Sequence, residues 1–191
     1  LGLLSRILYS KDPVVEMGSC FPYPHPNAEK IISMVEMAHA ELGLTDGPTH
    51  TEVIIDQYGE VEIIDLNPRF VGADVLQSIN HALNTRIEET LLDYALGKAT
   101  WISKPAKQYS CLQYFLPPEV PTLEQVSFPH LPEVKFSTTF MPSGSRISGT
   151  KRQIDYLGCY LTVMPNFESA LLRSKELRSR VLVNGCFQGE Y

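Results

Sequence analysis

The sequence predicts an α+β fold in which an antiparallel sheet is covered by helices and is followed by a smaller β-rich subdomain. The first observation is a pair of β-rich runs, Thr51–Asp56 and Val61–Leu66, which flank a short polar stretch and are typical of a β-hairpin. The second is an amphipathic helical pattern directly upstream of this pair. The third is a series of strand-like runs separated by prolines in the second half of the chain. The order strand, helix, hairpin places the helix on one face of the sheet.

Size and charge limit the classes of function. The 191 residues are enough to bury a sizeable core in one or two domains. The net charge of −6 argues against nucleic acid or an anionic membrane as the main partner, because both require a basic surface. No apolar run approaches the roughly 18 residues of a membrane span, and we find no signal-peptide pattern. The four cysteines have no C-x-x-C spacing, so we expect free thiols in a reducing cytoplasm.

The first elements lead into the hairpin. Leu1–Tyr9 is apolar, and we expect it to be the remnant of an element whose partners lie upstream. Val14–Gly18 is predicted to be a short strand that runs into a proline-rich turn. Asn27 is a favourable N-cap for a helix that reaches about Leu42, and Gly43 is suited to the position just beyond the helix end.

A two-residue loop at Tyr58-Gly59 fixes the pairing of the hairpin strands. It places Glu52 opposite Asp65. By the same register, His50 lies opposite Asn67. Directly opposed acids are roughly 4.5–5.5 Å apart at their Cβ atoms and destabilise a sheet, so this cluster needs a compensating positive charge. Mg²⁺ would supply it, because Mg²⁺ takes oxygen ligands and keeps positions open for phosphates.

The alternative is a solvent-facing hairpin whose acids are simply exposed. Ile54 and Ile63 argue against it, because they make the second face of the hairpin apolar as well. A hairpin that is apolar on both faces is expected to be buried, and buried acids are paired or bind a metal. The strand also runs directly into Asn67-Pro68-Arg69, where the proline ends the ladder and the guanidinium can meet an oxyanion.

Glu52, followed thirteen residues later by Asp65-Leu-Asn67-Pro-Arg69, resembles the metal-binding end of the ATP-grasp carboxylate–amine/thiol ligases. The resemblance implies that Glu52, Asp65 and Asn67 hold two Mg²⁺ ions that bridge the phosphates of ATP. It also implies that Arg69 is the catalytic residue that stabilises the acyl-phosphate. Asp65 stands where the family usually has a glutamate, which is one methylene longer.

The resemblance spans most of residues 14–183 and is strongest for the L-amino-acid ligase and carnosine-synthase branch, whose members join two amino acids. In that branch a glutamate near the substrate matches Glu16, although Ser19 stands where a histidine is common. Gly72 and Ala73 would belong to the substrate-side loop. The small side chain of Ala73 replaces a bulky aromatic of some dipeptide ligases, which implies an amino-terminal substrate larger than alanine.

The next elements are helical. Ala73–Leu83 is predicted to be a helix that breaks around Asn84, and Thr85–Glu88 has the capping-box pattern that opens a second helix through Leu96. A shift in composition at Lys98–Gln108 divides the chain into residues 1–100, the ATP-grasp part with the hairpin, and residues 101–191, the β-rich subdomain.

The second half is predicted to contain four strand runs and one helix. The strand runs are Tyr109–Leu116, Val134–Met141, Arg146-Ile147 and Tyr156–Met164. Asn166 is expected to cap a helix that reaches about Val181, and residues 184–191 are expected to be a loose tail.

The resemblance also implies what the chain lacks. We find no glycine-rich phosphate loop and no lysine in a matching context, so we expect an upstream ATP-grasp half as a partner and no ligation by this chain alone. The expected reaction activates a carboxylate with ATP and transfers it to an amine, in the cytoplasm. Two alternatives stay open: an enzyme like carbamoyl-phosphate synthase or biotin carboxylase that activates bicarbonate, and a non-catalytic binding module. The oligomeric state also stays open, with a homodimer as one alternative.

Overall fold

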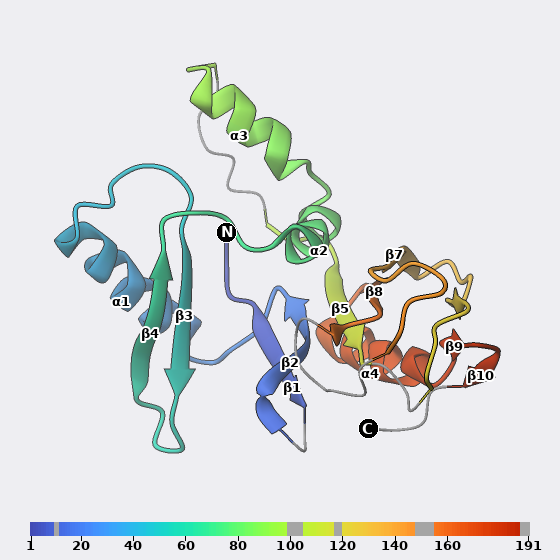
Figure 1. Cartoon of the computed structure of the whole chain (residues 1–191). Coiled ribbons are helices and arrows are strands. Elements are labelled where there is room, and N and C mark those ends of the chain that lie inside the picture. Colours follow the sequence, from blue (N-terminus) through green and yellow to red (C-terminus); the bar gives the residue numbers. More distant parts are fainter. Residues whose placement is uncertain (10–11, 99–104, 117–119, 148–154, 188–191) are drawn as a thin grey trace.

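The structure is a computed structural model, and it describes residues 1–9, 12–98, 105–116, 120–147 and 155–187. Its largest unit is an antiparallel sheet (Figure 1). The strands of this sheet lie in the order β1 (Ser5–Tyr9), β2 (Asp12–Phe21), β5 (Tyr109–Phe115), β8 (Gly158–Met164) and β7 (Val134–Thr139). The sheet therefore joins strands from both halves of the sequence, and the α+β fold class is confirmed.

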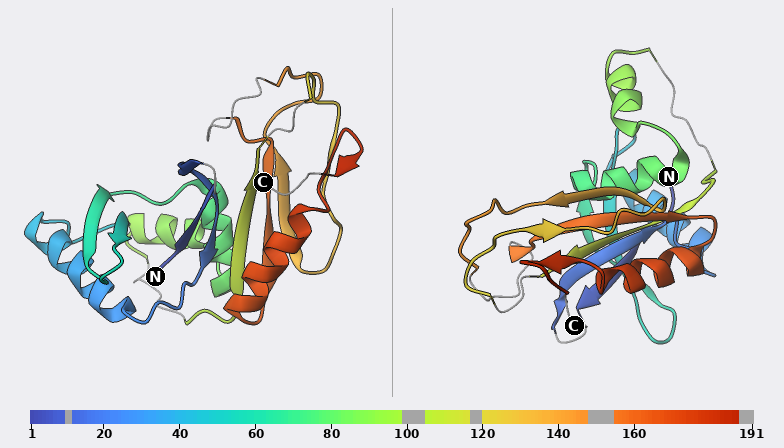
Figure 2. Two further views of the ribbon diagram at one scale, coloured as in Figure 1. Left: turned by 90° about the horizontal axis from the view of Figure 1, so that it is seen from below. Right: turned by 90° about the vertical axis from the view of Figure 1, so that its right-hand side faces the viewer.

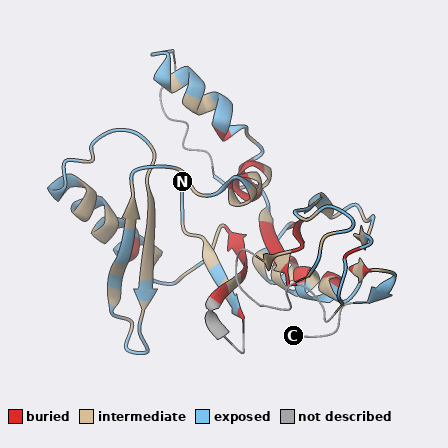
Figure 3. Cartoon of the chain, viewed as in Figure 1, coloured by how far each residue is buried: buried red, intermediate tan, exposed pale blue. Residues whose placement is uncertain are grey.

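Two helices cover opposite faces of the main sheet (Figure 2), namely α2 (Ala73–Leu83) and α4 (Phe167–Arg178). On one face, the hydroxyls of Ser78 in α2 and Ser110 in β5 are 2.7 Å apart. On the other face, the Tyr160 hydroxyl of β8 donates to the Ser174 carbonyl of α4 at 2.5 Å. Because both faces are covered, β5 and β8 are buried over most of their length (Figure 3).

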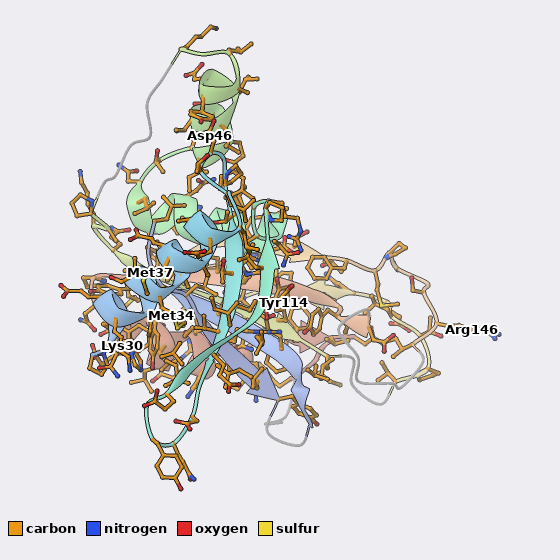
Figure 4. All side chains as sticks on the ribbon, turned by 90° about the vertical axis from the view of Figure 1, so that its left-hand side faces the viewer. Lys30, Met34, Met37, Asp46, Tyr114 and Arg146 are labelled. Carbon is orange, nitrogen blue, oxygen red and sulfur yellow. A yellow bond between two sulfur atoms is a disulfide. The ribbon has the colours of Figure 1, made fainter. Side chains whose placement is uncertain are left out.

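The predicted hairpin consists of β3 (His50–Ile55) and β4 (Val61–Asn67), and it forms a separate two-stranded sheet. Helix α1 (Ala28–Glu41) lies against one face of this hairpin, where His39 Nε2 and Thr51 Oγ1 are 2.9 Å apart. Figure 4 looks onto α1, whose outer side carries Lys30, Met34 and Met37. The prediction that this helix covers one face of the sheet holds for the hairpin, whereas the preceding strand, β2, belongs to the main sheet.

The turn of the hairpin differs from the prediction. The prediction of a two-residue loop at Tyr58-Gly59 is wrong, because the connection between the two strands consists of residues 56–60. The Asp56 carboxylate accepts hydrogen bonds from the backbone N–H groups of Tyr58 at 2.8 Å and Glu60 at 2.9 Å. An aspartate that bonds to the backbone just ahead of it favours such a turn, and this local signal outweighed the Tyr-Gly pair.

The expectation that the hairpin is buried on both faces is also wrong. Ile54 is 53% exposed and Ile64 is 51% exposed, and no residue of either strand is fully buried. Helix α1 covers one face, and these two isoleucines lie at the exposed surface. The argument that burial forces the acids to bind a metal therefore does not hold, and the site has to be judged from its own geometry.

The predicted first two helices are confirmed. The helix after Asn27 is α1, whose C-cap is Leu42 and which is followed by Gly43 with φ +70°, although the Asn27 side chain makes no capping hydrogen bond. The second is α2, whose bounds match the predicted Ala73–Leu83 and whose C-cap, Asn84, has the left-handed φ of +49°.

Helix α3 (Ile87–Ala95) begins differently from the prediction. The expected capping box of Thr85 and Glu88 does not form. Instead, Asn80 of α2 accepts a hydrogen bond from the Ile87 N–H at 2.9 Å and donates to both carboxylate oxygens of Glu88, at 3.0 and 2.8 Å. A side chain from the preceding helix therefore takes the capping role, and α3 projects away from the sheet (Figure 1).

The C-terminal region agrees with the prediction in part. Asn166 caps α4 by accepting from the Ser169 N–H at 2.9 Å, and the helix ends at Arg178 rather than near Val181. The start of the expected loose tail, residues 184–191, is instead paired in a three-stranded sheet, and residues 188–191 lie outside the described part. This sheet consists of β6 (Val126–Ser127), β9 (Leu182–Val183) and β10 (Cys186–Phe187).

The expectation of four free thiols is wrong. Cys20 of β2 and Cys111 of β5 are directly opposed in the main sheet and form a disulfide across 91 residues of sequence. Cys159 is a buried free thiol, and Cys186 is an exposed one. Scattered spacing along the chain could not reveal that two cysteines share one cross-strand position.

Two further points concern organisation. Within the described residues, no helix combines the length and apolarity needed to cross a membrane. The predicted boundary between residues 1–100 and 101–191 falls between β2 and β5, which pair in one sheet. The division into two domains stays a prediction.

Candidate functional site

The acidic end of the hairpin has the predicted pairing: Glu52 lies opposite Asp65, and His50 lies opposite Asn67. The Asn67 side-chain amide donates to Asp65 Oδ2 at 2.5 Å. The Nδ1 atom of His50 is buried and has no hydrogen-bond partner. Two carboxylates, an amide and an imidazole with an unsatisfied nitrogen therefore occupy paired positions where the hairpin ends.

A β-bulge brings these residues into register. Because the turn is longer than predicted, Val53 lies opposite Ile63, one residue out of the predicted pairing. Ile64 is then an extra residue on β4, and beyond it Glu52 faces Asp65. Bulges often occur near functional sites, where they redirect a side chain. The predicted pairing at the acids is confirmed, although the sequence argument did not include the bulge.

The residue that contacts Glu52 was missed by the sequence argument. Arg6 of β1 places Nη1 2.6 Å from Glu52 Oε2 and Nη2 3.1 Å from Glu16 Oε2. The three side chains are 38%, 25% and 20% exposed, respectively. The only signal for Arg6 in the sequence was a single charged residue inside the apolar stretch Leu1–Tyr9. Arg6 joins the hairpin to the main sheet.

Glu16 lies within β2, which is longer than the predicted strand Val14–Gly18. Burial raises the pKa of its carboxyl group, and the Arg6 guanidinium partly opposes this shift. The Tyr156 hydroxyl donates to the Glu16 backbone carbonyl, and the Tyr156 ring stacks on Tyr114 with centroids 4.6 Å apart. Burial raises the pKa of the Tyr114 phenol above its ordinary value, with a contribution from the negative charge of Asp74. Glu16 is therefore a half-buried carboxylate beside an aromatic wall.

Arg69 and the start of α2 lie beyond the acids. Arg69 is exposed, its Nη1 donates to the Phe70 carbonyl at 2.7 Å, and it forms no ion pair with any residue that the structure describes. Gly72 precedes α2 and Ala73 is its first residue, and both are exposed. Backbone N–H groups at a helix start are suited to an anion. Burial raises the pKa of Asp74, in the first turn of α2.

The donor set determines which metals could bind. In the described part of the chain, no three His, Cys, Asp or Glu side chains group together as a metal site. The cluster instead offers two carboxylates, Glu52 and Asp65, and the amide of Asn67. Mg²⁺ bound through one or two carboxylates takes its remaining ligands from water and substrate phosphates. The residues present fit an ion of this kind.

The structure thus brings some predicted site residues together and leaves others apart. Glu52, Asp65 and Asn67 form one cluster, and Arg6 links Glu52 to Glu16. For Arg69, Gly72 and Ala73, the structure records no contact with the acids among the described residues.

Comparisons of sequence and comparisons of structure with known proteins give different results. No family model matches the sequence, and no curated protein sequence matches it. Solved structures do match. Phosphoribosylglycinamide synthetase from Anaerococcus prevotii superposes with a TM-score of 0.80 at 17% identity, covering 94% of this chain and 48% of that protein. L-amino acid ligase from Bacillus licheniformis superposes with a TM-score of 0.78 at 22% identity, covering 94% of this chain and 46% of that enzyme.

A third match is the biotin carboxylase domain of 2-oxoglutarate carboxylase from Hydrogenobacter thermophilus, solved with MgADP, ADP and bicarbonate. Its TM-score is 0.70 at 16% identity, and the match covers 95% of this chain and 42% of that domain. This chain therefore spans less than half the length of each of these structures. All three proteins are ATP-grasp enzymes, and the chain has the ATP-grasp fold over the part of them that it covers.

Proposed function

We propose that this chain is the metal-binding part of an ATP-dependent ligase that activates a carboxylate as an acyl-phosphate and joins it to an amine. The observation that carries the proposal is the cross-strand pair of Glu52 and Asp65, followed directly by Asn67 and Arg69, on an ATP-grasp fold. The presence of an L-amino acid ligase among the matched structures supports amino acids as both substrates.

Glu52, Asp65 and Asn67 would hold Mg²⁺, one or two ions, which would neutralise the charge of the nucleotide phosphates. Ile54 and Ile64 are half-exposed isoleucines on the same two strands as these acids. An exposed apolar side chain on this hairpin would suit the base of a nucleotide whose phosphates reach the acids.

Arg69 would stabilise the negative charge that develops on the transferred phosphoryl group, because its guanidinium carries no competing ion pair among the described residues. The substrate side would lie at Glu16, Gly72 and Ala73. Glu16 would attract a substrate ammonium group, and the N–H groups at the start of α2 would attract a carboxylate.

The rest of such an enzyme would come from an upstream half. The chain covers at most 48% of the matched structures given above, and no glycine-rich phosphate loop occurs in its sequence. We therefore propose that the chain folds and binds a metal–nucleotide complex weakly, but that it ligates nothing by itself.

Binding can be tested on the chain alone. We expect MgADP to raise its thermal unfolding temperature and Glu52→Gln to remove this effect, because the substitution deletes one of the two paired carboxylates. The matched control is Glu62→Gln. Glu62 is an exposed acid on the same hairpin, but it faces Ile54 rather than another acid, so this variant should keep the response. A response that is lost equally in both variants, or is absent in the wild-type chain, would contradict the metal site.

The reaction class needs a second measurement on a protein that contains both halves. ADP release that rises with pairs of amino acids supports the ligase, whereas ADP release that rises with bicarbonate alone supports the alternative enzyme. Metal binding without ADP release under either condition supports the non-catalytic module.

A further inference from the structure

Arg6 holds two acids that the proposed function assigns to different ligands. Its Nη1 is 2.6 Å from Glu52, the proposed metal ligand, and its Nη2 is 3.1 Å from Glu16, the proposed ammonium site. These acids come from different strands, β3 and β2, and no other lysine or arginine in the described ranges pairs with either of them. Arg6 therefore supplies the positive charge that the opposed acids of the hairpin require.

The other acid of the pair is compensated differently. Asp65 Oδ2 accepts from the Asn67 amide at 2.5 Å, so it has a neutral donor rather than a cation. The strong, charge-assisted contact thus lies on the Glu52 side alone. A divalent ion that binds Glu52 meets a guanidinium already in place on the same carboxylate, and the two positive charges repel each other.

We propose that Arg6 is an internal counter-cation of this site: it pairs with both Glu52 and Glu16 while no metal is bound, and a divalent cation displaces it from Glu52. This inference rests on the proposed function, since it takes Glu52 to be a metal ligand. Arg6 is a positioning residue here, because it acts on the metal through Glu52.

A purely structural role for Arg6 and a competing role predict opposite changes in metal affinity when Arg6 is removed. If the ion pairs only hold the hairpin against β1, removing Arg6 misplaces Glu52 and weakens metal binding. If Arg6 competes with the metal, removing it frees Glu52 and strengthens binding. The sign of the change in metal affinity therefore separates the two roles.

The test uses Mn²⁺ as a probe, with its binding to the full chain measured by electron paramagnetic resonance. We expect Arg6→Gln to bind Mn²⁺ about fivefold more tightly than the wild-type chain, at the lower end of typical couplings between binding events. Arg6→Lys keeps the charge and should stay near the wild-type affinity. Arg86→Gln is the matched control, because Arg86 forms an exposed ion pair with Glu89 on α3, and it should leave the affinity unchanged.

Weaker or unchanged Mn²⁺ binding in Arg6→Gln would overturn the proposal while leaving the metal site intact, provided that Glu52→Gln abolishes binding in the wild-type background. If the wild-type chain binds no Mn²⁺, both the metal site and the counter-cation role fail. A second measurement avoids the variants altogether. The side-chain NMR signals of Arg6 in the wild-type chain should shift and gain rotational freedom on adding Mg²⁺, and signals that stay unchanged would contradict displacement.

Discussion

At Glu16, burial and an ion pair act in opposite directions on one carboxyl group. Burial has the larger effect, and the pKa of Glu16 is raised although Arg6 lies 3.1 Å away. The folded chain therefore binds the Glu16 proton more tightly than the unfolded chain does. It follows that the contribution of this group to stability falls as the pH rises from its unfolded-state pKa of 4.5 through the higher folded-state value.

Glu16→Gln should remove this pH dependence, since glutamine is similar in size and does not ionise. We expect the free energy of unfolding of the variant, relative to the wild-type chain, to increase as the pH is raised from 4.5 towards neutrality. Urea unfolding of both proteins at several pH values measures the difference. A difference that stays constant with pH would show that the Glu16 pKa is not raised by folding.

The residue types of the site could be predicted from the sequence, but their compensating charge could not. Glu52, Asp65 and Asn67 follow from a local pattern within one hairpin, where pairing depends on few residues. Arg6 lies 46 residues before Glu52, and only the folded arrangement of β1 and β3 brings the two side chains within reach of each other. Long-range contacts of this kind leave no periodic pattern in a single sequence.

At the scale of elements, the junction of α2 and α3 shows a tertiary contact replacing a local one. The sequence assigned the cap of α3 to Thr85, whereas Asn80 provides the hydrogen bonds to Ile87 and Glu88. The two assignments therefore predict that substitutions at different residues will destabilise the start of α3.

We expect Asn80→Ala to lower the free energy of unfolding by about 1–2 kcal/mol, because it removes a cap and leaves the Ile87 N–H unsatisfied. Thr85→Ala is the matched control and should cost less than about 0.5 kcal/mol, in the range of surface substitutions. Chemical denaturation of the two variants gives both values. Equal losses of stability in the two variants, or a larger loss for Thr85→Ala, would contradict capping by Asn80 and support the capping box of Thr85 and Glu88.

In the hairpin, the wrongly predicted turn and the bulge that was not predicted have opposite effects on the strand pairing. The turn held by Asp56 shifts the pairing by one residue, and the bulge at Ile64 shifts it back before Glu52 and Asp65. A shift of one residue in the pairing moves every side chain beyond it to the opposite face of the sheet. Because both faces of this hairpin carry apolar residues, the apolar pattern is similar with and without the bulge, and the sequence could not reveal it. The predicted pairing of the two acids was correct for this combined reason.

At the scale of the whole molecule, the Cys20–Cys111 disulfide ties together two strands that are adjacent in the sheet and 91 residues apart in sequence. A cross-link that closes a loop of this length is expected to add up to about 4–5 kcal/mol of stability. We therefore expect urea unfolding to shift to lower denaturant concentration after reduction.

Counting thiols checks the pairing directly. The denatured, unreduced chain should react at two cysteines, Cys159 and Cys186, and the reduced chain at four. Four reactive thiols before reduction would show that the chain does not carry the disulfide, and the sequence-based expectation of free thiols would then stand.

The sequence by itself determined the α+β class, the bounds of α2, the ends of α1 and the presence of paired acids on one hairpin. Each of these depends on periodicity, capping residues or turn residues within a short stretch of chain. The tertiary structure alone decided the pairing of β2 with β5, the disulfide between them and the contact of Arg6 with Glu16 and Glu52. These features depend on which distant segments bury each other's apolar surfaces, and that choice is made by the fold as a whole.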